Sequence, residues 1–203
     1  MSRVLPRSFY ARPTVEVARE LIGKVLVHVT PAGATAGTIV EVEAYVGEAD
    51  PACHAASGLT RRNAPLYGPP GRAYVYLNYG IHYLVNAVTE PEGAPAAVLV
   101  RALEPRDGTE LMRKRRSRGM SYGMTLPSDV ELCRGPGNLT RAMGISGKQN
   151  QVDLSRGRLF IEDRGGTRLP VGWSSRIGIA LGTGRKWRCY VSGNSYVSAL
   201  TRR

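Results

Sequence analysis

The feature of this sequence that most restricts the fold is a run of alternating side chains at positions 38–46, TIVEVEAYV. Successive side chains of a β-strand point to opposite faces, so the run predicts a strand with one apolar face and one polar face. The apolar face, which must meet a core, would contain Val40, Val42, Ala44 and Val46. The other face would contain Ile39, Glu41, Glu43 and Tyr45.

The two carboxylates of this strand are candidates for chemistry. Glu41 and Glu43 would lie about 7 Å apart on the same face. Like charges at that separation disfavour joint ionisation in a partly dry site, and a carboxylate in such a setting is a candidate general base. The alternative interpretation is an ordinary half-solvated strand whose acidic side chains face water.

A second informative segment, residues 72–88, has alternating runs on either side of the tripeptide at 78–80, which predicts a β-hairpin. Tyr74 and Tyr76 would share one face, with Tyr79 at the tip. Burying several phenols would require a hydrogen-bond partner for each hydroxyl. A partly exposed aromatic surface that stacks on nucleic-acid bases is therefore one interpretation. A tyrosine ladder that stabilises the sheet is the other.

The rest of the chain gives mixed helix and strand signals. Helix signals are an N-cap at Thr14 with a stop at Gly23, an N-cap at Asp107, a capping box of Ser128 and Glu131, and a stop at Gly144. Further strands are expected at 24–30, 96–101 (ending on Arg101), 158–163, 176–181 and 188–193, with a turn at 31–37. We therefore predict one α+β domain over 1–203, a curved, mainly antiparallel, open barrel-like sheet with helices at its edges.

The chain is strongly basic. Its 28 Lys and Arg residues against 16 Asp and Glu give a net charge of +12 and a pI near 10.1. Guanidinium groups match phosphate oxygens, so this excess predicts a polyanionic partner such as nucleic acid. A genomic preference for arginine would explain Arg over Lys, but it would not explain the excess of bases over acids. The long loop at 47–71 carries Arg61 and Arg62, which suit a phosphate backbone.

Several classes of protein are disfavoured. Cys53, Cys133 and Cys189 lack the spacing of a disulfide frame or a zinc site, and the three histidines are far apart in the sequence. We therefore expect no metal and no cofactor. No apolar run approaches the ~18 residues of a membrane span, and the N-terminus lacks an apolar signal core. A cytoplasmic monomer without membrane contact is expected.

Four segments, in order and at matching spacing, carry a resemblance to a known family. They are IVEVEAYVGEADPACHA, RNAPLYGPPGRAYVYLNYGIHYLVNAV, VLVRALEP and ELCRGPGNLTRAMGI. The chain resembles the alkyladenine (3-methyladenine) DNA glycosylase family of the mammalian type, from about Leu5 to the C-terminus. The resemblance implies base excision repair of double-stranded DNA. The enzyme would flip out alkylated or deaminated purines (3-methyladenine, 7-methylguanine, hypoxanthine, ethenoadenine) and hydrolyse the N-glycosidic bond.

The resemblance also implies roles for individual residues. Glu43 matches the general base that activates water, Arg101 a residue that helps hold that water, and Val191 a main-chain contact to it. The pocket for the extruded base matches Tyr45, His54, Tyr76, Asn86 and Leu99. Asn86 matches the residue that crowds the amino group of guanine. Because no lysine lies in the matching segments, a monofunctional enzyme is expected.

Contacts to DNA are expected from the hairpin and from the preceding loop. Tyr79 matches a wedge that fills the gap left in the duplex. The other expected contacts are Thr60, Arg61, Arg62, Tyr74, Gly80 and His82. Asn78 and His82 flank the wedge where the mammalian enzymes carry apolar residues, and this departure concerns the anchoring of the wedge and the substrate range.

Two other functions fit parts of the sequence. A non-catalytic nucleic-acid-binding module could use the tyrosine hairpin as a stacking platform, and it would bind undamaged single strands without releasing bases. A carbohydrate hydrolase could use Glu41 and Glu43. The second alternative is disfavoured, because two carboxylates on one strand do not readily flank a sugar from opposite faces.

Overall fold

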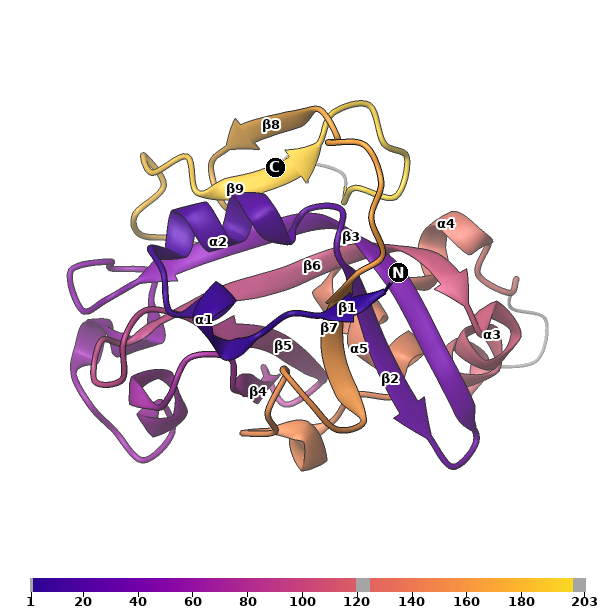
Figure 1. The fold of residues 1–203 in the computed structure, drawn as a ribbon, viewed down its shortest axis with the longest axis horizontal. Coiled ribbons are helices and arrows are strands. Elements are labelled where there is room, and N and C mark those ends of the chain that lie inside the picture. Colours follow the sequence, from indigo (N-terminus) through magenta and orange to yellow (C-terminus); the bar gives the residue numbers. More distant parts are fainter. Residues whose placement is uncertain (1, 120–124, 199–203) are drawn as a thin grey trace.

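The computed structural model describes residues 2–119 and 125–198, and its frame is one large antiparallel sheet with helices packed against it (Figure 1). The strands are β1 (Arg3–Val4), β2 (Val25–Thr30), β3 (Gly33–Val46), β4 (Ala73–Asn78), β5 (His82–Val88), β6 (Ala96–Asp107), β7 (Leu159–Asp163), β8 (Val171–Ser174) and β9 (Arg188–Val191). The α-helices are α1 (Arg7–Tyr10), α2 (Thr14–Leu21), α3 (Thr109–Ser117), α4 (Asp129–Leu132) and α5 (Pro136–Met143). Short 3-10 turns are η1 (His54–Ser57), η2 (Ala64–Tyr67) and η3 (Gly147–Gln149).

The sheet runs in the order β1-β7-β2-β3-β6-β5-β4, with β9 paired to β3 and β8 paired to β9. The path ends at β1 and β4 without closing into a barrel, so the prediction of an α+β fold with an open, antiparallel sheet is confirmed. Strand β3 is central, because it pairs with β6 along most of its length. Its other edge pairs first with β2 as far as Thr38 and then with β9 from Glu41 to Glu43.

A β-bulge lies where β3 changes partner. The register between β3 and β6 shifts between Ile39 and Glu41, and again between Glu41 and Val42. A bulge adds one residue to a strand and reverses the faces that follow it. The prediction that Val40 and Val42 share a face was therefore wrong: Ile39 joins Val42 in the main core, and Val40 packs instead with Ala102.

The main core lies between the sheet and the helices. Buried apolar side chains of α2, α3 and α5 meet those of β3 and β6, and prominent members are Leu21, Ile39, Val42, Val100, Leu103, Met112, Leu139 and Met143. Helix α2 is present as predicted, but Thr14 is its first residue and not its N-cap. The Thr14 N–H is bound by the remote carboxylate of Glu90, 2.7 Å away, and the N-cap position itself is Pro13.

The hairpin prediction is confirmed. Strands β4 and β5 pair from Ala73↔Ala87 to Asn78↔His82. Tyr79 and Gly80 turn the chain with positive φ angles of 49° and 70°. The predicted stop of α5 at Gly144, which has a φ of 71°, is also confirmed.

Three local predictions were wrong. Residues 31–37 do not form only a turn, because β3 already begins at Gly33. Arg101 does not end its strand, because β6 continues to Asp107. Asp107 therefore does not cap α3: Gly108 stands at the N-cap with a φ of 72°, and a Cβ there would lie 2.2 Å from the carbonyl oxygen of Ala34. Only glycine fits that turn.

The segment at 176–181 also differs from its prediction. It is irregular, and the strand that pairs with β9 is β8, from Val171 to Ser174. Its alternating apolar residues suggested a strand. In the structure Arg176 Nη1 donates to the Ala44 carbonyl oxygen and the Ile177 N–H donates to the Glu43 carboxylate, so the segment is attached to β3 by side-chain and main-chain contacts.

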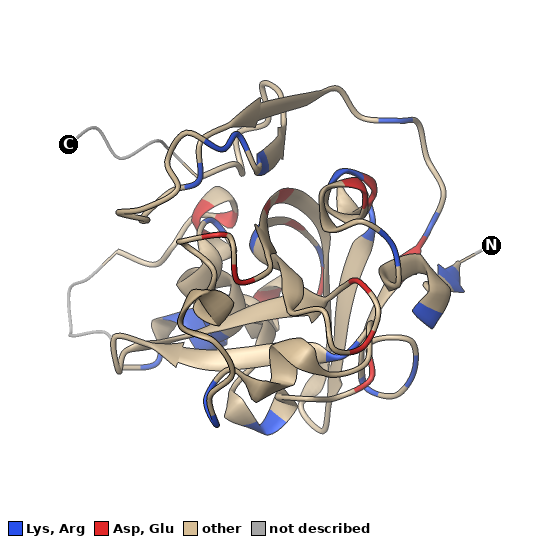
Figure 2. Ribbon diagram, turned by 90° about the vertical axis from the view of Figure 1, so that its left-hand side faces the viewer, with Lys and Arg blue, Asp and Glu red and all other residues tan. Residues whose placement is uncertain are grey.

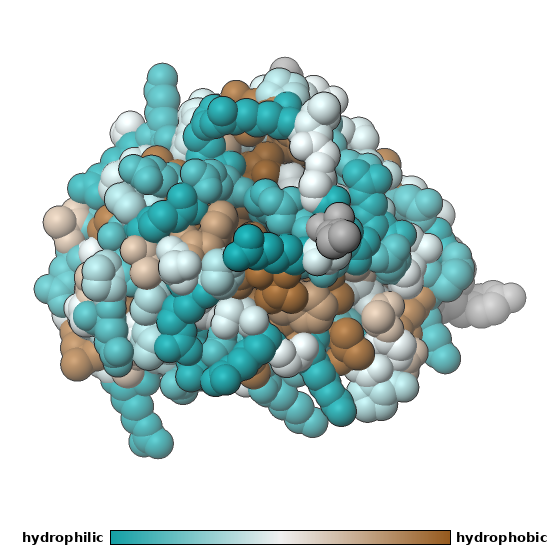
Figure 3. Space-filling view, in the orientation of Figure 1, coloured by the Kyte–Doolittle hydropathy of each residue, from teal (hydrophilic) through white to brown (hydrophobic). Residues whose placement is uncertain are grey.

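Charge and hydropathy are unevenly placed on this fold. Figure 2 shows Lys and Arg spread over outer loops and helices, while acidic segments also lie on the curved strands inside. The face in Figure 3 is mostly hydrophilic, with hydrophobic side chains visible mainly in its recesses. Within the described ranges, no helix is both long enough and apolar enough to cross a membrane.

Candidate active site

A cavity of about 520 Å³ opens beside the hairpin, within the range of about 300–1,000 Å³ that is usual for small-molecule sites. Its walls come from β3, β4, β5 and β6, from the loop after β3, from the N-terminal end of α5 and from the segment at 177–179. The predicted residues among its lining are Tyr45, His54, Tyr74, Tyr76, Tyr79, His82, Asn86, Leu99 and Arg101. Residues as far apart in the sequence as Tyr45 and Ile179 thus meet around one cavity.

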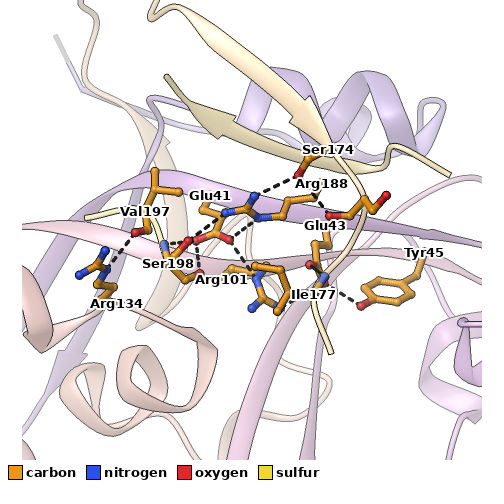
Figure 4. Close-up of polar contacts among 11 residues, drawn as sticks. Glu41, Glu43, Tyr45, Arg101, Arg134, Ser174, Ile177, Arg188, Val197 and Ser198 are labelled. Atoms are coloured by element: carbon orange, nitrogen blue, oxygen red, sulfur yellow. Dashed lines mark hydrogen bonds and ion pairs between the residues drawn. The ribbon is translucent and has the colours of Figure 1, made fainter. Parts of the chain in front are cut away.

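Glu43 lies directly behind the wall of this cavity. Its side chain is completely buried, and its three hydrogen-bond donors all belong to residues that line the cavity (Figure 4). The Tyr45 hydroxyl donates to Oε2 over 2.8 Å and Arg101 Nη1 over 3.2 Å. The backbone N–H of Ile177 donates to Oε1 over 2.7 Å. The carboxylate is therefore held in a polar cluster one hydrogen bond away from the cavity.

Arg101 connects Glu43 to the second carboxylate of the strand. Its Nε donates to Glu41 Oε1 over 3.1 Å, while its Nη1 reaches Glu43. Burial by itself would lower the pKa of Arg101, but the charges of Glu43 and Glu41 outweigh burial and raise that pKa. The guanidinium stays cationic between the two carboxylates, and the prediction that both carboxylates share one face is confirmed.

The aromatic walls form a continuous group. The rings of Tyr74 and Tyr76 are stacked with centroids 5.2 Å apart, and the His54 ring meets Tyr76 edge-on at 4.5 Å. Burial raises the pKa of Tyr45 and of Tyr76, and it raises that of Tyr74 to about 12. These phenols are therefore neutral near pH 7, so they can donate hydrogen bonds and present uncharged rings.

His54 stands at the rim of the cavity. Its Nδ1 lies 2.9 Å from the Tyr74 hydroxyl. Burial of part of the ring lowers the pKa of His54, and the nearby charge of Arg62 lowers it further. The ring is therefore neutral near pH 7, and the Tyr74 phenol is the natural donor to Nδ1.

Asn86 and Leu99 form a buried part of the lining, and they are cross-strand partners on β5 and β6. The Asn86 amide nitrogen donates to the Tyr74 carbonyl oxygen over 3.0 Å. This bond fixes the orientation of the amide, so its position at the cavity wall is a rigid steric feature.

The residues expected to contact DNA fall into two groups. Tyr79 is 86% exposed at the hairpin tip, next to Gly80 and His82, and it also borders the cavity. Thr60, Arg61 and Arg62 are exposed on the loop after β3. Tyr74 differs, because its side chain is buried and supports His54. The expectation that Tyr74 itself touches DNA is replaced by a supporting role in the cavity.

Val191 is buried on β9 against Val40 and Ala102, and it is not part of the cavity lining. Its main-chain contact to the attacking water stays a prediction. A main-chain contact to Glu43 itself comes from Ile177. The irregular segment brings that N–H to the carboxylate, whereas the regular β9 ladder engages the backbone around Val191 in sheet pairing.

A buried ion pair fixes the segment that carries Ile177. Arg176 Nη1 and Nη2 donate to the two carboxylate oxygens of Asp50 over 2.5 and 2.7 Å, and both side chains are completely buried. The Arg176 guanidinium also lies 4.6 Å from the ring centroid of Tyr45. Sequence analysis missed both residues of this pair. They are 126 positions apart, and no local pattern links them.

The site offers no evident metal ligands. Within residues 2–119 and 125–198, no group of three His, Cys, Asp or Glu side chains could hold a metal ion. The three cysteines are buried and free, and burial raises the pKa of Cys53, which lines the cavity.

The chain combines a cavity with aromatic walls, a buried carboxylate behind one wall and an exposed tyrosine on the rim with a net charge of +12. A DNA glycosylase requires a pocket that can receive a base turned out of the duplex. Comparison with known proteins agrees. The family model for methylpurine-DNA glycosylase (MPG) matches residues 8–195. The chain belongs to this family, and it is an enzyme of the DNA glycosylase class.

Relatives extend over nearly the whole chain. A protein of Chlorobium phaeobacteroides (strain BS1) is 47% identical over 196 residues, which cover 96% of this chain and 94% of the relative. A protein of Burkholderia lata is 46% identical over 204 residues, covering 98% and 94%. One of Salinibacter ruber is 47% identical over 207 residues, covering 96% of each. All three carry the name "Putative 3-methyladenine DNA glycosylase".

The Asp50–Arg176 pair generates a stability prediction. Asp50→Asn leaves the buried Arg176 cation without a charged partner, and breaking a buried pair in this way costs about 3–5 kcal/mol. We expect the free energy of unfolding, measured in urea, to fall by that amount. The double variant Asp50→Asn/Arg176→Met also removes the unpaired Arg176 cation, so it should restore most of the lost free energy of unfolding. An unchanged free energy of unfolding in the single variant would contradict this account.

The Asp50–Arg176 pair also makes the free energy of unfolding depend on pH. Burial raises the pKa of Asp50, but the hydrogen bonds and charge of Arg176 outweigh burial and lower it overall. A lowered pKa in the folded state stabilises the fold above the ordinary Asp value of about 3.9, and this stabilisation is lost as the pH falls through the folded-state pKa. The difference in unfolding free energy between wild type and Asp50→Asn should therefore be constant near neutral pH and shrink below about pH 4.

Proposed function

We propose that this enzyme hydrolyses the N-glycosidic bond of alkylated or deaminated purines that have been turned out of double-stranded DNA. The proposed lesions are 3-methyladenine, 7-methylguanine, hypoxanthine and ethenoadenine. The observation that carries the proposal is the placement of Glu43 one hydrogen bond behind an aromatic cavity of base size. The names of the relatives support 3-methyladenine as one of the bases.

Base flipping supplies the route into the cavity. A base inside a duplex is not accessible, and extracting it costs a few kcal/mol of stacking and pairing, less for a damaged base. Tyr79 is exposed at the hairpin tip and borders the cavity, so it can fill the gap that the extruded base leaves. Arg61 and Arg62 are exposed on the loop beside the cavity and can contact the phosphate backbone.

The aromatic walls can then hold the extruded base. Tyr45 and Tyr76 present neutral rings, on which a methylated, cationic purine gains a cation–π attraction. Asn86, which is held rigidly by its bond to the Tyr74 carbonyl, would crowd the exocyclic amino group of an undamaged guanine. Leu99 beside it offers apolar contact to the ring.

Hydrolysis requires one water and one base. The water oxygen bonds to C1′ while the C1′–N bond breaks, and the purine leaves with the bonding electron pair. A cationic methylpurine leaves as a neutral molecule without a general acid. Glu43 takes the proton from the water as the sugar gains oxocarbenium character. Since Glu43 is covered by Tyr45, Arg101 and Ile177, one of these three contacts must open when substrate enters.

The proposed product is an abasic site in an uncut strand. A bifunctional enzyme would need an amine in the cavity, and none of the four lysines lines it. We further propose that the protein acts as a monomer on cytoplasmic or nucleoid DNA, because a single chain forms the cavity.

Glu43→Gln tests the general base. The amide keeps the size of the side chain but does not accept the proton, and general-base catalysis contributes about 10²–10⁴-fold. Release of 3-methyladenine from methylated duplex DNA, followed with enzyme in excess, should slow by that factor. Glu48→Gln, the same change at an exposed position whose carboxylate bonds Tyr67, is the matched control and should leave the rate unchanged. Wild-type release by Glu43→Gln would remove Glu43 as the base.

Tyr79→Ala tests the wedge. Loss of the ring removes about 1–3 kcal/mol of stacking on neighbouring bases, and the cavity walls stay in place. Affinity for a duplex containing a stable abasic-site analogue should fall about 5- to 150-fold. Tyr79→Phe keeps the ring and should bind like wild type. Equal binding of this duplex by Tyr79→Ala and wild type would refute the wedge.

A further inference from the structure

Glu41 occupies an unusual position for an acidic residue, because all of its acceptor capacity is used inside the protein. Its side chain is completely buried, and it is not part of the cavity lining. Oε1 accepts from Arg101 Nε over 3.1 Å and from Arg188 Nε over 2.7 Å. Oε2 accepts from the backbone N–H of Ser198 over 2.7 Å and from the Ser198 hydroxyl. A carboxylate has about four acceptor sites, so Glu41 is saturated.

Glu43 is different in this respect. Among the described residues it accepts only three donors, from Tyr45, Arg101 and Ile177, and so it keeps acceptor capacity. Of the two carboxylates on β3, Glu43 is thus the one able to bind a further proton donor such as water. Arg101 gives one N–H to each carboxylate (Figure 4). The asymmetry comes from the other donors, because Arg188 and Ser198 supply three to Glu41 while Tyr45 and Ile177 supply two to Glu43.

Arg101 could also bind Glu43 more tightly than it does. A guanidinium prefers to place two parallel N–H groups on one carboxylate, and such bidentate pairs are strong. In the structure the bond from Nε to Glu41 holds the guanidinium in an orientation in which Nη1 is the nitrogen that reaches Glu43. Glu41 is itself fixed by Arg188, whose other nitrogens donate to the Ser174 hydroxyl and the Ser198 carbonyl over 3.0 and 3.1 Å.

We propose that Glu41 is a positioning residue that keeps Arg101 from closing on Glu43 as a bidentate pair, and so preserves the basicity and the acceptor capacity of Glu43. This role rests on the proposed function of Glu43 as the general base. The β-bulge at Val40 and the change of β3 partner from β2 to β9 bring Arg188 and Ser198 to Glu41. The C-terminal segment at 197–198 thereby belongs to the support of the site, with Arg134 Nε donating to the Val197 carbonyl over 2.9 Å.

Glu41→Gln tests this role. Without the negative charge, Arg101 has Glu43 as its remaining charged partner in the cluster and should close on it. With enzyme in excess over methylated sites in duplex DNA, the rate of 3-methyladenine release should fall about 10- to 100-fold. The dissociation constant for a duplex with a stable abasic-site analogue should stay within about twofold of wild type. The acid limb of the pH–rate profile should also move to lower pH, because Glu43 then protonates less readily beside a bidentate arginine.

Two controls separate positioning from folding. Glu104→Gln makes the same change on β6, where the carboxylate pairs with Arg106 outside the cluster, and it should leave the rate and the acid limb unchanged. If Glu41→Gln unfolds because the buried Arg188 loses its charged partner, the double variant Glu41→Gln/Arg188→Gln removes the Arg188 cation as well. It should show the same slow release and the same shifted acid limb.

The outcomes are distinct. A slower rate with a shifted acid limb supports the role of Glu41. A wild-type rate, or a rate that falls only in proportion to the folded fraction with the acid limb unmoved, overturns it. Failure of the proposed function would be seen separately, as wild-type release by Glu43→Gln.

Discussion

The arrangement of the site depends on one shared guanidinium. Arg101 lies between Glu41 and Glu43, with a single N–H on each, in a region from which solvent is almost excluded. Two carboxylates on one strand face would otherwise repel each other at short range. The cation between them allows both to be buried, and Arg188 supplies a second cation for Glu41. The result is a balanced cluster in which one carboxylate is saturated and the other keeps acceptor capacity.

The fold is built so that this cluster sits against a cavity. Strand β3 changes partner from β2 to β9 at its bulge, and this change opens space for Arg188 and the C-terminal segment on one side of the cluster. On the other side β5 and β6 carry Asn86 and Leu99 into the cavity wall. Aromatic rings and a neutral histidine form much of the cavity lining, the Arg101 cation is also part of it, and the Glu43 carboxylate lies behind it.

Local sequence patterns predicted the regular elements that carry the site. The alternation at 38–46 placed Glu41, Glu43 and Tyr45 together, and the hairpin with Tyr79 at its tip followed from the runs around 78–80. The resemblance to a known family supplied the remaining cavity residues. Patterns did not predict the bulge at Val40, because a single inserted residue leaves alternation intact on either side. Nor did they predict the contacts of Ile177 and Arg176, which join residues 134 and 126 positions apart through irregular backbone.

The most direct measurement is a crystal structure of the enzyme bound to a duplex containing 3-deaza-3-methyladenine, an isostere of 3-methyladenine with a stable glycosidic bond. The account predicts that the modified base lies in the cavity against Tyr45 and Tyr76, with Tyr79 in the duplex gap. A Glu43 oxygen should then approach C1′ with space for one water between them. That water would lie one hydrogen-bond length of about 2.6–3.2 Å from Glu43 and about 3–3.5 Å from C1′. A base that remains stacked in the duplex, or one bound with C1′ turned away from Glu43, would contradict the central claim.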